Sequence, residues 1–291
     1  MRKILVIGAQ NIDLFAHSKS DYVLHDSNIS KIHMAFGGVG CNIATNLSIL
    51  GNPVDFLTVF GEDYLSQVAK QNLSDLNIHF NESCVVENAG NSIYLGIMDK
   101  ANDLYLGLND MDILNSLDVT FFKDKTPYIE NFDTLVIDNN LNLKALQYLL
   151  KVFKHKKIIM DAVSASKALK LKGLLSSIFL LKLNMMELDA LSDKIKISER
   201  LDELLNQGLS SVILTNSAKE IIFKSTNTHI TTKPISIQKI ENATGAGDAF
   251  VSGYIHGLMQ GKLIEECLEI AKKAAYSCLQ SPNSTIEKQC N

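Results

Sequence analysis

The sequence has no apolar run long enough to span a bilayer and no long run of charges of either sign. Its formal net charge is −4, so neither nucleic acid nor an anionic membrane is favoured as a partner. The first stretch, MRKILVIGAQNID, is typical of a short buried strand rather than of a signal peptide. What is present is a chain of 291 residues, 46% of them hydrophobic, which is long enough to bury one sizeable core.

Cysteine is scarce and its spacing is uninformative for metal binding. The five cysteines are widely spaced and form no CxxC pair (Cys41, Cys84, Cys267, Cys278 and Cys290). An odd number of unpaired cysteines argues against a zinc site and favours a reducing compartment, so we expect a cytoplasmic protein. The seven histidines are scattered without the spacing of metal ligands.

Several common catalytic motifs are also absent. There is no GxxxxGK[ST] P-loop, no GxGxxG after the first strand and no GxSxG elbow. These absences exclude the usual phosphate loop, an ordinary dinucleotide site and the serine elbow of a hydrolase. If the protein is an enzyme, we expect its catalytic group to be a carboxylate.

Short apolar runs alternate with helical patterns along the chain. Continuous apolar strands separated by helices predict an α/β sandwich around a mostly parallel sheet that is buried on both faces. The predicted strands are 3–9, 54–60, 134–138, 157–162, 178–184 and 211–215, and the predicted helices are 39–50, 63–76, 142–155, 198–207, 247–260 and 263–279.

Two regions break this rhythm. Residues 14–36 and 84–108 contain patterns that alternate between apolar and polar, which is typical of strands with one exposed face. We place them in a small antiparallel lid beside the main sheet. An exposed sheet face is usually covered, so we expect a homodimer formed through these two lid segments. Without an internal repeat or a linker, residues 1–291 are predicted to form one domain.

The stretch NATGAGDAF, residues 242–250, places small residues directly before an aspartate and a helical pattern. Glycines at a helix start let a ligand approach the backbone, and the unpaired N–H groups there bind phosphate. Asp248 beside such a site would repel phosphate, but it suits a general base that accepts a proton from an attacking hydroxyl. The alternative is that Asp248 only caps the helix.

Two further stretches carry polar residues at similar places. GGVGCNIATNLSILG, residues 37–51, begins with a glycine pair, and Asn42 can donate and accept hydrogen bonds, which suits a polyhydroxylated ligand. The alternative is a tight turn with a solvated asparagine. In KLNMMELDAL, residues 182–191, Asn184 and Glu187 have the spacing of a capping box. The functional interpretation makes this pair an outer-sphere organiser of Mg²⁺ and phosphate.

In this order, the three stretches resemble the ribokinase-like (PfkB) family of carbohydrate and nucleoside kinases, and the resemblance extends along nearly the whole chain. It implies a three-layer α/β/α sandwich with a small antiparallel β lid. It also implies ATP and Mg²⁺, with a monovalent cation such as K⁺ held near Asn242. Asp248 would be the catalytic base, and the backbone of Gly245, Ala246 and Gly247 would form the anion hole.

The resemblance assigns further residues to the two substrates. Asp13, which ends the stretch GAQNID, would hold sugar hydroxyls, and Glu187 would reach the metal only through water. The remaining predicted acceptor-binding residues are Asn11, Gly37, Gly38, Asn42, Asn109 and Lys167, and the predicted ATP-binding residues are Asn184, Glu187, Thr215, Thr244 and Gly247.

Within the family, several stretches are similar to those of bacterial pseudouridine kinases. They are GGVGxNIAxNL, the NDM tripeptide at 109–111, the VSAxK segment at 163–167 and ATGAGDA. The implied reaction is transfer of the ATP γ-phosphoryl group to the 5′-hydroxyl of pseudouridine. The alternatives are a kinase for ribose, fructose or a purine nucleoside, and a regulator that binds a nucleotide or sugar without catalysis.

One turn departs from the family pattern. The family usually has a TxGxxG-like turn near the nucleotide, whereas this sequence has TNSAKE at 215–220. Ser217 and Glu220 therefore stand where glycines are expected. Their side chains occupy space and add a negative charge, so we expect this turn to weaken ATP binding.

Overall fold

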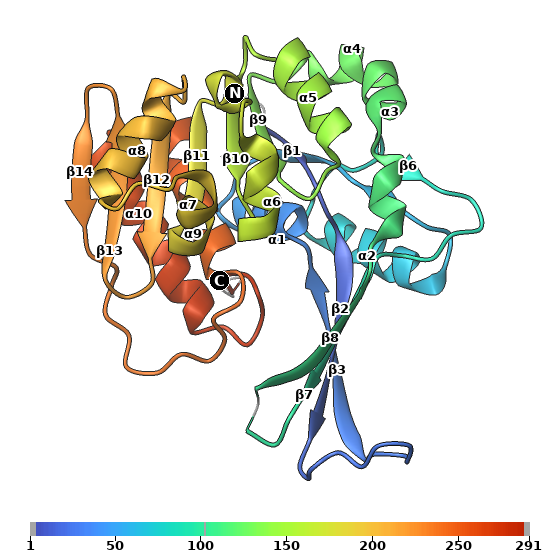
Figure 1. Ribbon diagram of the computed structural model, residues 1–291. Coiled ribbons are helices and arrows are strands. Elements are labelled where there is room, and N and C mark those ends of the chain that lie inside the picture. Colours follow the sequence, from blue (N-terminus) through green and yellow to red (C-terminus); the bar gives the residue numbers. More distant parts are fainter. Residues whose placement is uncertain (1–3, 102, 288–291) are drawn as a thin grey trace.

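The large sheet confirms the predicted α/β class. The structure, a computed structural model, describes residues 4–101 and 103–287 and arranges this sheet in the order β14-β13-β12-β11-β10-β9-β1-β4 (Figure 1). The strands from β12 to β4 run parallel, and β13 and β14 add an antiparallel edge. The bounds are β1 Ile4–Ile7, β4 Val54–Leu57, β9 Thr134–Asp138, β10 Lys157–Asp161, β11 Leu180–Asn184, β12 Ser211–Asn216, β13 Glu220–Ser225 and β14 His229–Thr232.

Helices cover both faces of this sheet and complete the three predicted layers. Alternate strand residues point to opposite faces, so Leu5 and Ile7 join one hydrophobic cluster while Ile4 and Val6 join the other. The first cluster packs under α3 Val119–Asp124, α5 Leu143–Val152, α7 Met185–Leu191 and α8 Ile197–Asn206. The second packs under α1 Val39–Ile49, α2 Tyr64–Asp75, α9 Ala246–Met259 and α10 Ile264–Leu279. Shorter elements are α4 Thr126–Ile129, α6 Ala165–Ala168 and the 3₁₀ turns η1 Asp112–Ser116, η2 Leu169–Leu171 and η3 Leu175–Ser177.

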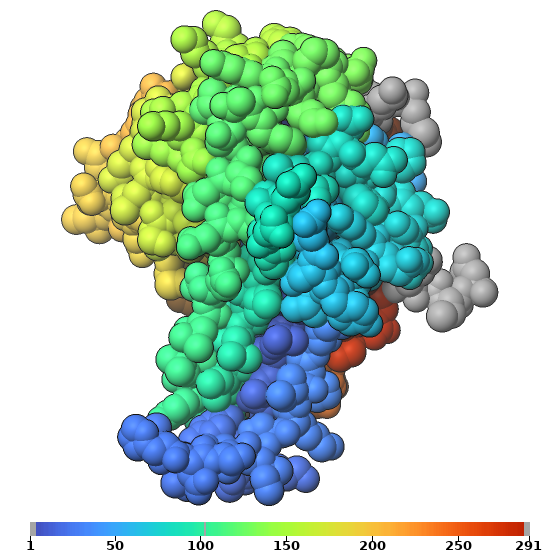
Figure 2. All heavy atoms as spheres, turned by 90° about the vertical axis from the view of Figure 1, so that its right-hand side faces the viewer, coloured from blue at the N-terminus to red at the C-terminus, as the bar shows by residue number. Residues whose placement is uncertain are grey.

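A second sheet forms the lid and projects from the body of the molecule (Figures 1 and 2). Its order is β3-β2-β7-β8, with β2 Asn11–Ser18, β3 Ser30–Gly37, β7 Ile93–Met98 and β8 Leu104–Asp110. The two outer pairings are antiparallel as predicted, whereas the central pairing of β2 with β7 is parallel. The parallel pair arises because α1, β4, β5 and α2 all lie between β3 and β7 in the chain.

Some predicted boundaries are wrong. The second lid segment begins at Ile93 rather than at residue 84, because β6 Cys84–Val85 pairs with β5 Val59–Phe60 outside the lid. The predicted strand 54–60 is accordingly interrupted at Thr58, whose carbonyl accepts a hydrogen bond from the backbone of Cys84. Lys3, with which the first predicted strand begins, and Cys290 lie outside the described residues, as do residues 1–2 and 288–291 of the predicted domain.

The lid has one polar and one apolar face. The strand register places Asp13 beside Tyr94 on the face toward the body, where both line a cleft. Leu14 and Leu95 lie on the opposite face and are partly buried. Met34 (48% exposed) and Leu108 (50% exposed) lie on the same face as these two and are more exposed. Among residues 4–101 and 103–287, none of the helices has the combined length and hydrophobicity that a membrane span needs.

Candidate active site

A cleft of about 1070 Å³ lies between the base of the lid and the carboxyl ends of the parallel strands. Strand β1 pairs with β4 on one side and β9 on the other, so the chain order reverses there, and open α/β sheets bind ligands at such a reversal. Three cleft-lining residues lie at or next to the carboxyl ends of β10, β11 and β12, namely Asp161, Asn184 and Thr215. The N-terminus of α9 also lines the cleft.

The start of α9 has glycines at 245 and 247 because neighbouring atoms leave no room for side chains there. Gly245 has φ 80°, in the left-handed region, and a Cβ added there would lie 1.9 Å from the carbonyl oxygen of Ser284. A Cβ on Gly247 would lie 2.6 Å from Nζ of Lys182. Within the described residues no side chain caps this helix, so its first N–H groups face the cleft with the positive end of the helix dipole.

Asp248 is the third residue inside α9, after Gly245 at the N-cap, and it does not cap the helix. Its side chain is buried and accepts a hydrogen bond of 2.8 Å from Nδ2 of Asn42 on α1. Burial and the neighbouring carboxylate of Asp161 raise the pKa of Asp248 to about 7, although Lys182 and the Asn42 bond lower it. A carboxylate with a pKa near neutrality can accept and release a proton under ordinary conditions.

Asp13 lines the end of the cleft where the resemblance predicts the acceptor, which we call the acceptor end. It accepts a hydrogen bond from the side chain of Asn11, and burial raises its pKa to about 6. Gly37 lies directly behind it, because a Cβ there would come within 2.2 Å of the carboxylate. Gly38 adopts φ 93° and packs against the backbone of Ala9. The predicted glycine pair therefore makes room for Asp13 and for the turn into α1, and Gly38 itself lines the cleft.

Asp138, a residue that the sequence analysis missed, holds this end together. It is fully buried at the end of β9 and accepts backbone hydrogen bonds from Ala9 at 2.8 Å and from Gly40 at 2.7 Å. Burial raises its pKa, and these backbone donors oppose the rise. Asp138 thus ties the end of β1 and the start of α1 to the central strand, which fixes Asp13 and Asn42 relative to each other.

The Asn184–Glu187 pair forms a capping box at the start of α7. The backbone and the side-chain amide of Asn184 each donate to one oxygen of Glu187 at 2.8 Å, and the Glu187 backbone donates to Asn184 at 3.0 Å. Both residues also line the cleft. The two interpretations of this motif are therefore compatible, since the capping box presents a buried carboxylate beside the space for phosphate.

Two more charged residues that the sequence analysis missed lie beneath α9. Lys182 on β11 and Asp161 at the end of β10 form a buried ion pair of 2.9 Å, and both line the cleft. The sequence does contain a signal for both residues, because each is a charged residue in a largely apolar strand: Asp161 ends KIIMD, and Lys182 is the third residue of LLKLN. Such charges are almost never fully buried unless they are paired or functional.

The other end of the cleft, where the resemblance predicts ATP and which we call the nucleotide end, is lined by many apolar side chains. It is lined by Thr215 and Ser217 of the β12–β13 hairpin, and by the long connection between β14 and α9 (Figure 1). Ser217 has φ 47°, a left-handed conformation that favours glycine. Glu220 pairs with Asn216 in the strand register, one residue before the cleft-lining Ile221, so its side chain points away from the face that Ile221 offers. The other lining residues here include Ile235, Ile237, Ile240, Thr244, Ala275, Tyr276 and Leu279.

The remaining predicted residues lie around the acceptor end. Lys167 lines the cleft, and its ammonium donates to the side chain of Asn140, which also lines it. Burial lowers the pKa of Lys167. Asn109 lies on the exposed strand β8 opposite Tyr94 in the register, on the cleft-facing side of the lid.

The donor set of the site fits ATP with a largely hydrated Mg²⁺. Among the described residues no group of three or more His, Cys, Asp or Glu side chains is arranged to hold a metal ion. Both oxygens of Glu187 are already hydrogen-bonded to Asn184. Mg²⁺ commonly keeps several waters and binds through substrate phosphates, and this arrangement leaves room for that mode. The N–H groups at the start of α9, which no described side chain caps, line the cleft and suit a phosphate.

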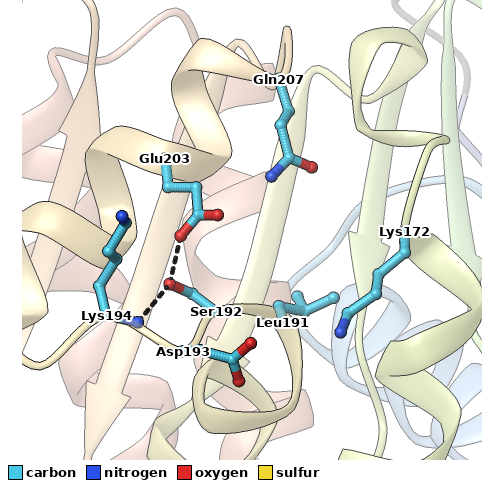
Figure 3. A pocket seen from close by; sticks show the side chains of 7 residues that line it. All are labelled: Lys172, Leu191, Ser192, Asp193, Lys194, Glu203 and Gln207. Atoms are coloured by element: carbon cyan, nitrogen blue, oxygen red, sulfur yellow. Dashed lines mark hydrogen bonds between the residues drawn. The ribbon is translucent and has the colours of Figure 1, made fainter.

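A second hollow, of about 420 Å³, lies beside α7 and α8, away from these residues (Figure 3). The side chains of Ser192 and Glu203 point toward one another there and are hydrogen-bonded at 2.5 Å. The predicted site residues all lie elsewhere, so we assign no function to this hollow. It is lined by Lys172, Leu191, Ser192, Asp193, Lys194, Glu203 and Gln207.

Comparison with known proteins identifies the class. Residues 1–289 match the pfkB family of carbohydrate kinases, and the chain belongs to this family. It is therefore a sugar or nucleoside kinase with a hydroxyl group as acceptor, and kinases of this family use ATP.

Individual relatives cover nearly the whole chain. Pseudouridine kinase from Escherichia coli is 29% identical over 97% of this chain and 93% of its own length. Guanosine-inosine kinase from Exiguobacterium acetylicum is 24% identical over 98% and 97%. The structure of Arabidopsis thaliana ribokinase complexed with ribose and ATP superimposes with a TM-score of 0.85, at 19% identity over 99% and 96% of the two chains. That last likeness confirms the fold.

Proposed function

We propose that the cleft transfers the γ-phosphoryl group of ATP to the 5′-hydroxyl of a ribosyl compound, and that this compound is pseudouridine. The observation that carries the proposal is the position of Asp248. Its buried carboxylate lies between the polar acceptor end and the open nucleotide end, directly beside the first N–H groups of α9. A hydroxyl held by Asp13 and Asn42 would meet both a proton acceptor and a phosphate-binding helix end.

Each group has one part in this reaction. Asp248 accepts the proton of the attacking hydroxyl, and the backbone of residues 245–247 stabilises the transferring phosphoryl group. Asp13 accepts hydrogen bonds from ribose hydroxyls, and Asn42 holds the Asp248 carboxylate in place at 2.8 Å. When bound, Mg²⁺ neutralises charge on the triphosphate. Asn184 and Glu187 organise the water around that ion.

The position of a monovalent cation follows from the resemblance and is part of the same proposal. Asn242 donates to the carbonyl of Pro282 at 3.3 Å, and Gly245 packs against the carbonyl of Ser284. This contact brings main-chain oxygens together beside the anion hole, and oxygen donors suit a hard cation such as K⁺. Replacing K⁺ with a bulky organic cation should then lower the rate.

Pseudouridine is favoured over uridine because of a single donor. Its base is linked through carbon and presents an extra N–H along the edge nearest the sugar. A pocket that accepts this bond leaves its own polar atom unpaired with uridine, at a cost of roughly 1–3 kcal/mol, or about tenfold to over a hundredfold. The group we assign to this edge comprises Asn109, Asp110, Ser164 and Lys167, of which Lys167 lines the cleft beside Asn140. Asn109, Asp110 and Ser164 carry oxygens that can accept this bond, whereas the ammonium of Lys167 can only donate. The register pairs Asn109 with the cleft-lining Tyr94 but pairs Asp110 with Ile93 on the opposite lid face, which favours Asn109 over Asp110.

Other acceptors are the second candidate function. Guanosine-inosine kinase matches 98% of this chain, about the same share as pseudouridine kinase, which favours a purine nucleoside as the alternative. A regulator without catalysis is the third candidate, raised by the altered 215–220 turn. The buried and hydrogen-bonded Asp248 speaks against that candidate, because a regulator has no need of a proton acceptor there.

The test is a comparison of kcat/KM across acceptors. Purified protein is supplied with ATP and Mg²⁺, and ADP release is measured with pseudouridine, uridine, adenosine, ribose and fructose. We expect pseudouridine to exceed uridine by at least about tenfold. A ratio near one, or a preference for ribose, would contradict the pseudouridine assignment and leave the kinase assignment standing.

The homodimer belongs to the same proposal. Leu14, Met34, Leu95 and Leu108 form a continuous apolar face on the side of the lid away from the cleft, and two of them are about half exposed. Covering such a face with a second copy removes it from water. Light scattering should show a dimer, and Leu108→Lys should dissociate it, whereas His33→Lys on the other lid face should not. A monomer at micromolar concentration would contradict the assignment.

A further inference from the structure

Lys182 lines the cleft with a side chain that is almost fully buried. Lys182 is the middle residue of β11, and its buried ammonium is ion-paired with Asp161 at 2.9 Å. The ammonium also lies against the backbone of Gly247, on the side where a Cβ would be, and so lies next to the proposed anion hole. A buried ion pair usually costs more in desolvation than it returns in attraction, which makes its presence at this point informative.

Two elements of the fold hold the pair. Asp161 uses one carboxylate oxygen for Lys182 and the other for the backbone of Val163, which donates at 2.8 Å. Val163 has φ 69°, a conformation that a β-branched residue rarely adopts, and it lines the cleft. The backbone of Ala162 donates to the carbonyl of Lys182 at 3.1 Å. The pair is therefore anchored on both strands and does not swing freely.

We propose that Lys182 and Asp161 are positioning residues that together determine whether Asp248 can accept the proton of the acceptor hydroxyl. The inference deepens the proposed function and rests on it. Lys182 supplies a positive charge that acts on Asp248, while Asp161 both holds that cation and adds a negative charge. The two residues therefore have opposite effects on Asp248: Lys182 favours its ionised form, and Asp161 disfavours it.

The charged groups around Asp248 come from several elements. Asp138 of β9 and Asp161 of β10 disfavour its ionisation, Lys182 of β11 favours it, and α1 contributes the hydrogen bond from Asn42. The buried thiol of Cys278 on α10 also senses the Asp248 charge. Lys182 therefore offsets the carboxylates and the burial that raise the pKa of Asp248 to about 7.

The test exploits the opposite signs of the two partners. The acid limb of kcat/KM against pH reports the free enzyme's base, so wild type should lose activity below about pH 7. Lys182→Met removes the favourable charge and should move the limb to higher pH by about one unit or more. Asp161→Asn removes the unfavourable charge and should move it to lower pH. The double variant should lie between them, and Lys224→Met, which removes the surface ion pair with Asp202, should leave the limb unchanged.

A second readout needs no substrate. Because the pKa of Asp248 is higher in the folded protein, wild type loses stability relative to Asp248→Asn as pH rises from about 4, and the loss levels off above about 7. In Lys182→Met this levelling should occur at higher pH, and in Asp161→Asn at lower pH. If one single variant does not fold, the other and the double variant still report a shift.

The outcomes separate the inference from the proposed function. If the pH profiles of Lys182→Met and Asp161→Asn shift in opposite directions, in kcat/KM or in stability, the inference is supported. If wild type is an active kinase that Asp248→Asn inactivates, but the pH profiles of Lys182→Met and Asp161→Asn coincide with that of wild type, the inference is wrong and the proposed function stands. Failure of wild type to phosphorylate any of the five acceptors contradicts the proposed function, whatever the stability curves show.

Discussion

The two ends of the cleft are built in different ways. At the acceptor end, polar side chains such as Asp13 and Asn42 are buried and hydrogen-bonded, and Asp138 fixes the backbone behind them. At the nucleotide end, the walls are apolar side chains and a long connection, with Ile240 half exposed. If the acceptor and the nucleotide bind as proposed, individual polar side chains contact the acceptor, whereas an apolar surface and the backbone contact the nucleotide. Substitutions should therefore act sharply at the acceptor end and mildly at the nucleotide end.

Asp248, at the junction of the two ends, should give the largest effect. Asp248→Asn keeps the size and shape of the side chain but removes proton acceptance, so kcat should fall by about 10²–10⁴-fold with substrate binding largely intact. Steady-state kinetics with the best acceptor and ATP measure this change. The matched control is Asp118→Asn, since Asp118 caps α3 by accepting from the backbone of Phe121 at 2.8 Å. If Asp248→Asn keeps more than about a tenth of wild-type turnover, Asp248 has only a structural role.

Asp13 should give the next largest effect, and it should be confined to the acceptor. Asp13→Asn loses the charged acceptor for ribose hydroxyls, so the KM for the acceptor should rise by roughly tenfold to a hundredfold, with little change in the KM for ATP. Asp21→Asn, which removes only the surface ion pair with Lys100, is the control. An equal rise in both KM values would show that the two ends are not separate.

The same carboxylate predicts a pH dependence. Burial raises the pKa of Asp13 to about 6, so the side chain becomes protonated and a weaker acceptor as pH falls below that value. The acceptor KM of wild type should therefore increase on acidification below about pH 6. In Asp13→Asn this part of the increase should disappear, and a dependence that persists unchanged would assign it to another group.

The smallest effect should lie at the nucleotide end. Ser217→Gly removes a side chain that lines the cleft and suits the left-handed φ of 47°, so the KM for ATP should fall by a few-fold. Asn77→Gly is the matched control, because Asn77 has a similar φ of 53° and lies after α2. Adding Glu220→Gly should bring little more, since Glu220 lies within β13. An unchanged KM for ATP would mean that the turn does not contact the nucleotide.

The contrast between the two ends also explains what the sequence could predict. The three layers and the parallel sheet follow from apolar runs of the right length, because each run is buried on both faces. Asn42 and Asp248 were predicted because neighbouring glycines mark places where a ligand can approach the backbone closely, whereas Asp13 was predicted from the family resemblance. Their roles remain predictions, but the structure brings all three into one cleft.

The residues that escaped prediction depend on contacts between distant parts of the chain. Asp138 acts through the backbones of Ala9 and Gly40, which lie about 100 or more residues away, and no local pattern reveals such a contact. The parallel pairing inside the lid likewise depends on where β7 returns after α2. At the nucleotide end, apolar side chains from separate elements form the wall, so no single motif marks it.

The most direct test of this account is the identity of the product. Purified protein is incubated with ATP, Mg²⁺ and pseudouridine, and the products are resolved by ³¹P NMR and mass spectrometry. We expect one phosphomonoester on the 5′-hydroxyl for each ADP formed, and none with Asp248→Asn. Phosphate on another hydroxyl, or ADP released without a phosphorylated acceptor, would contradict the proposal that the cleft holds a ribosyl 5′-hydroxyl against Asp248.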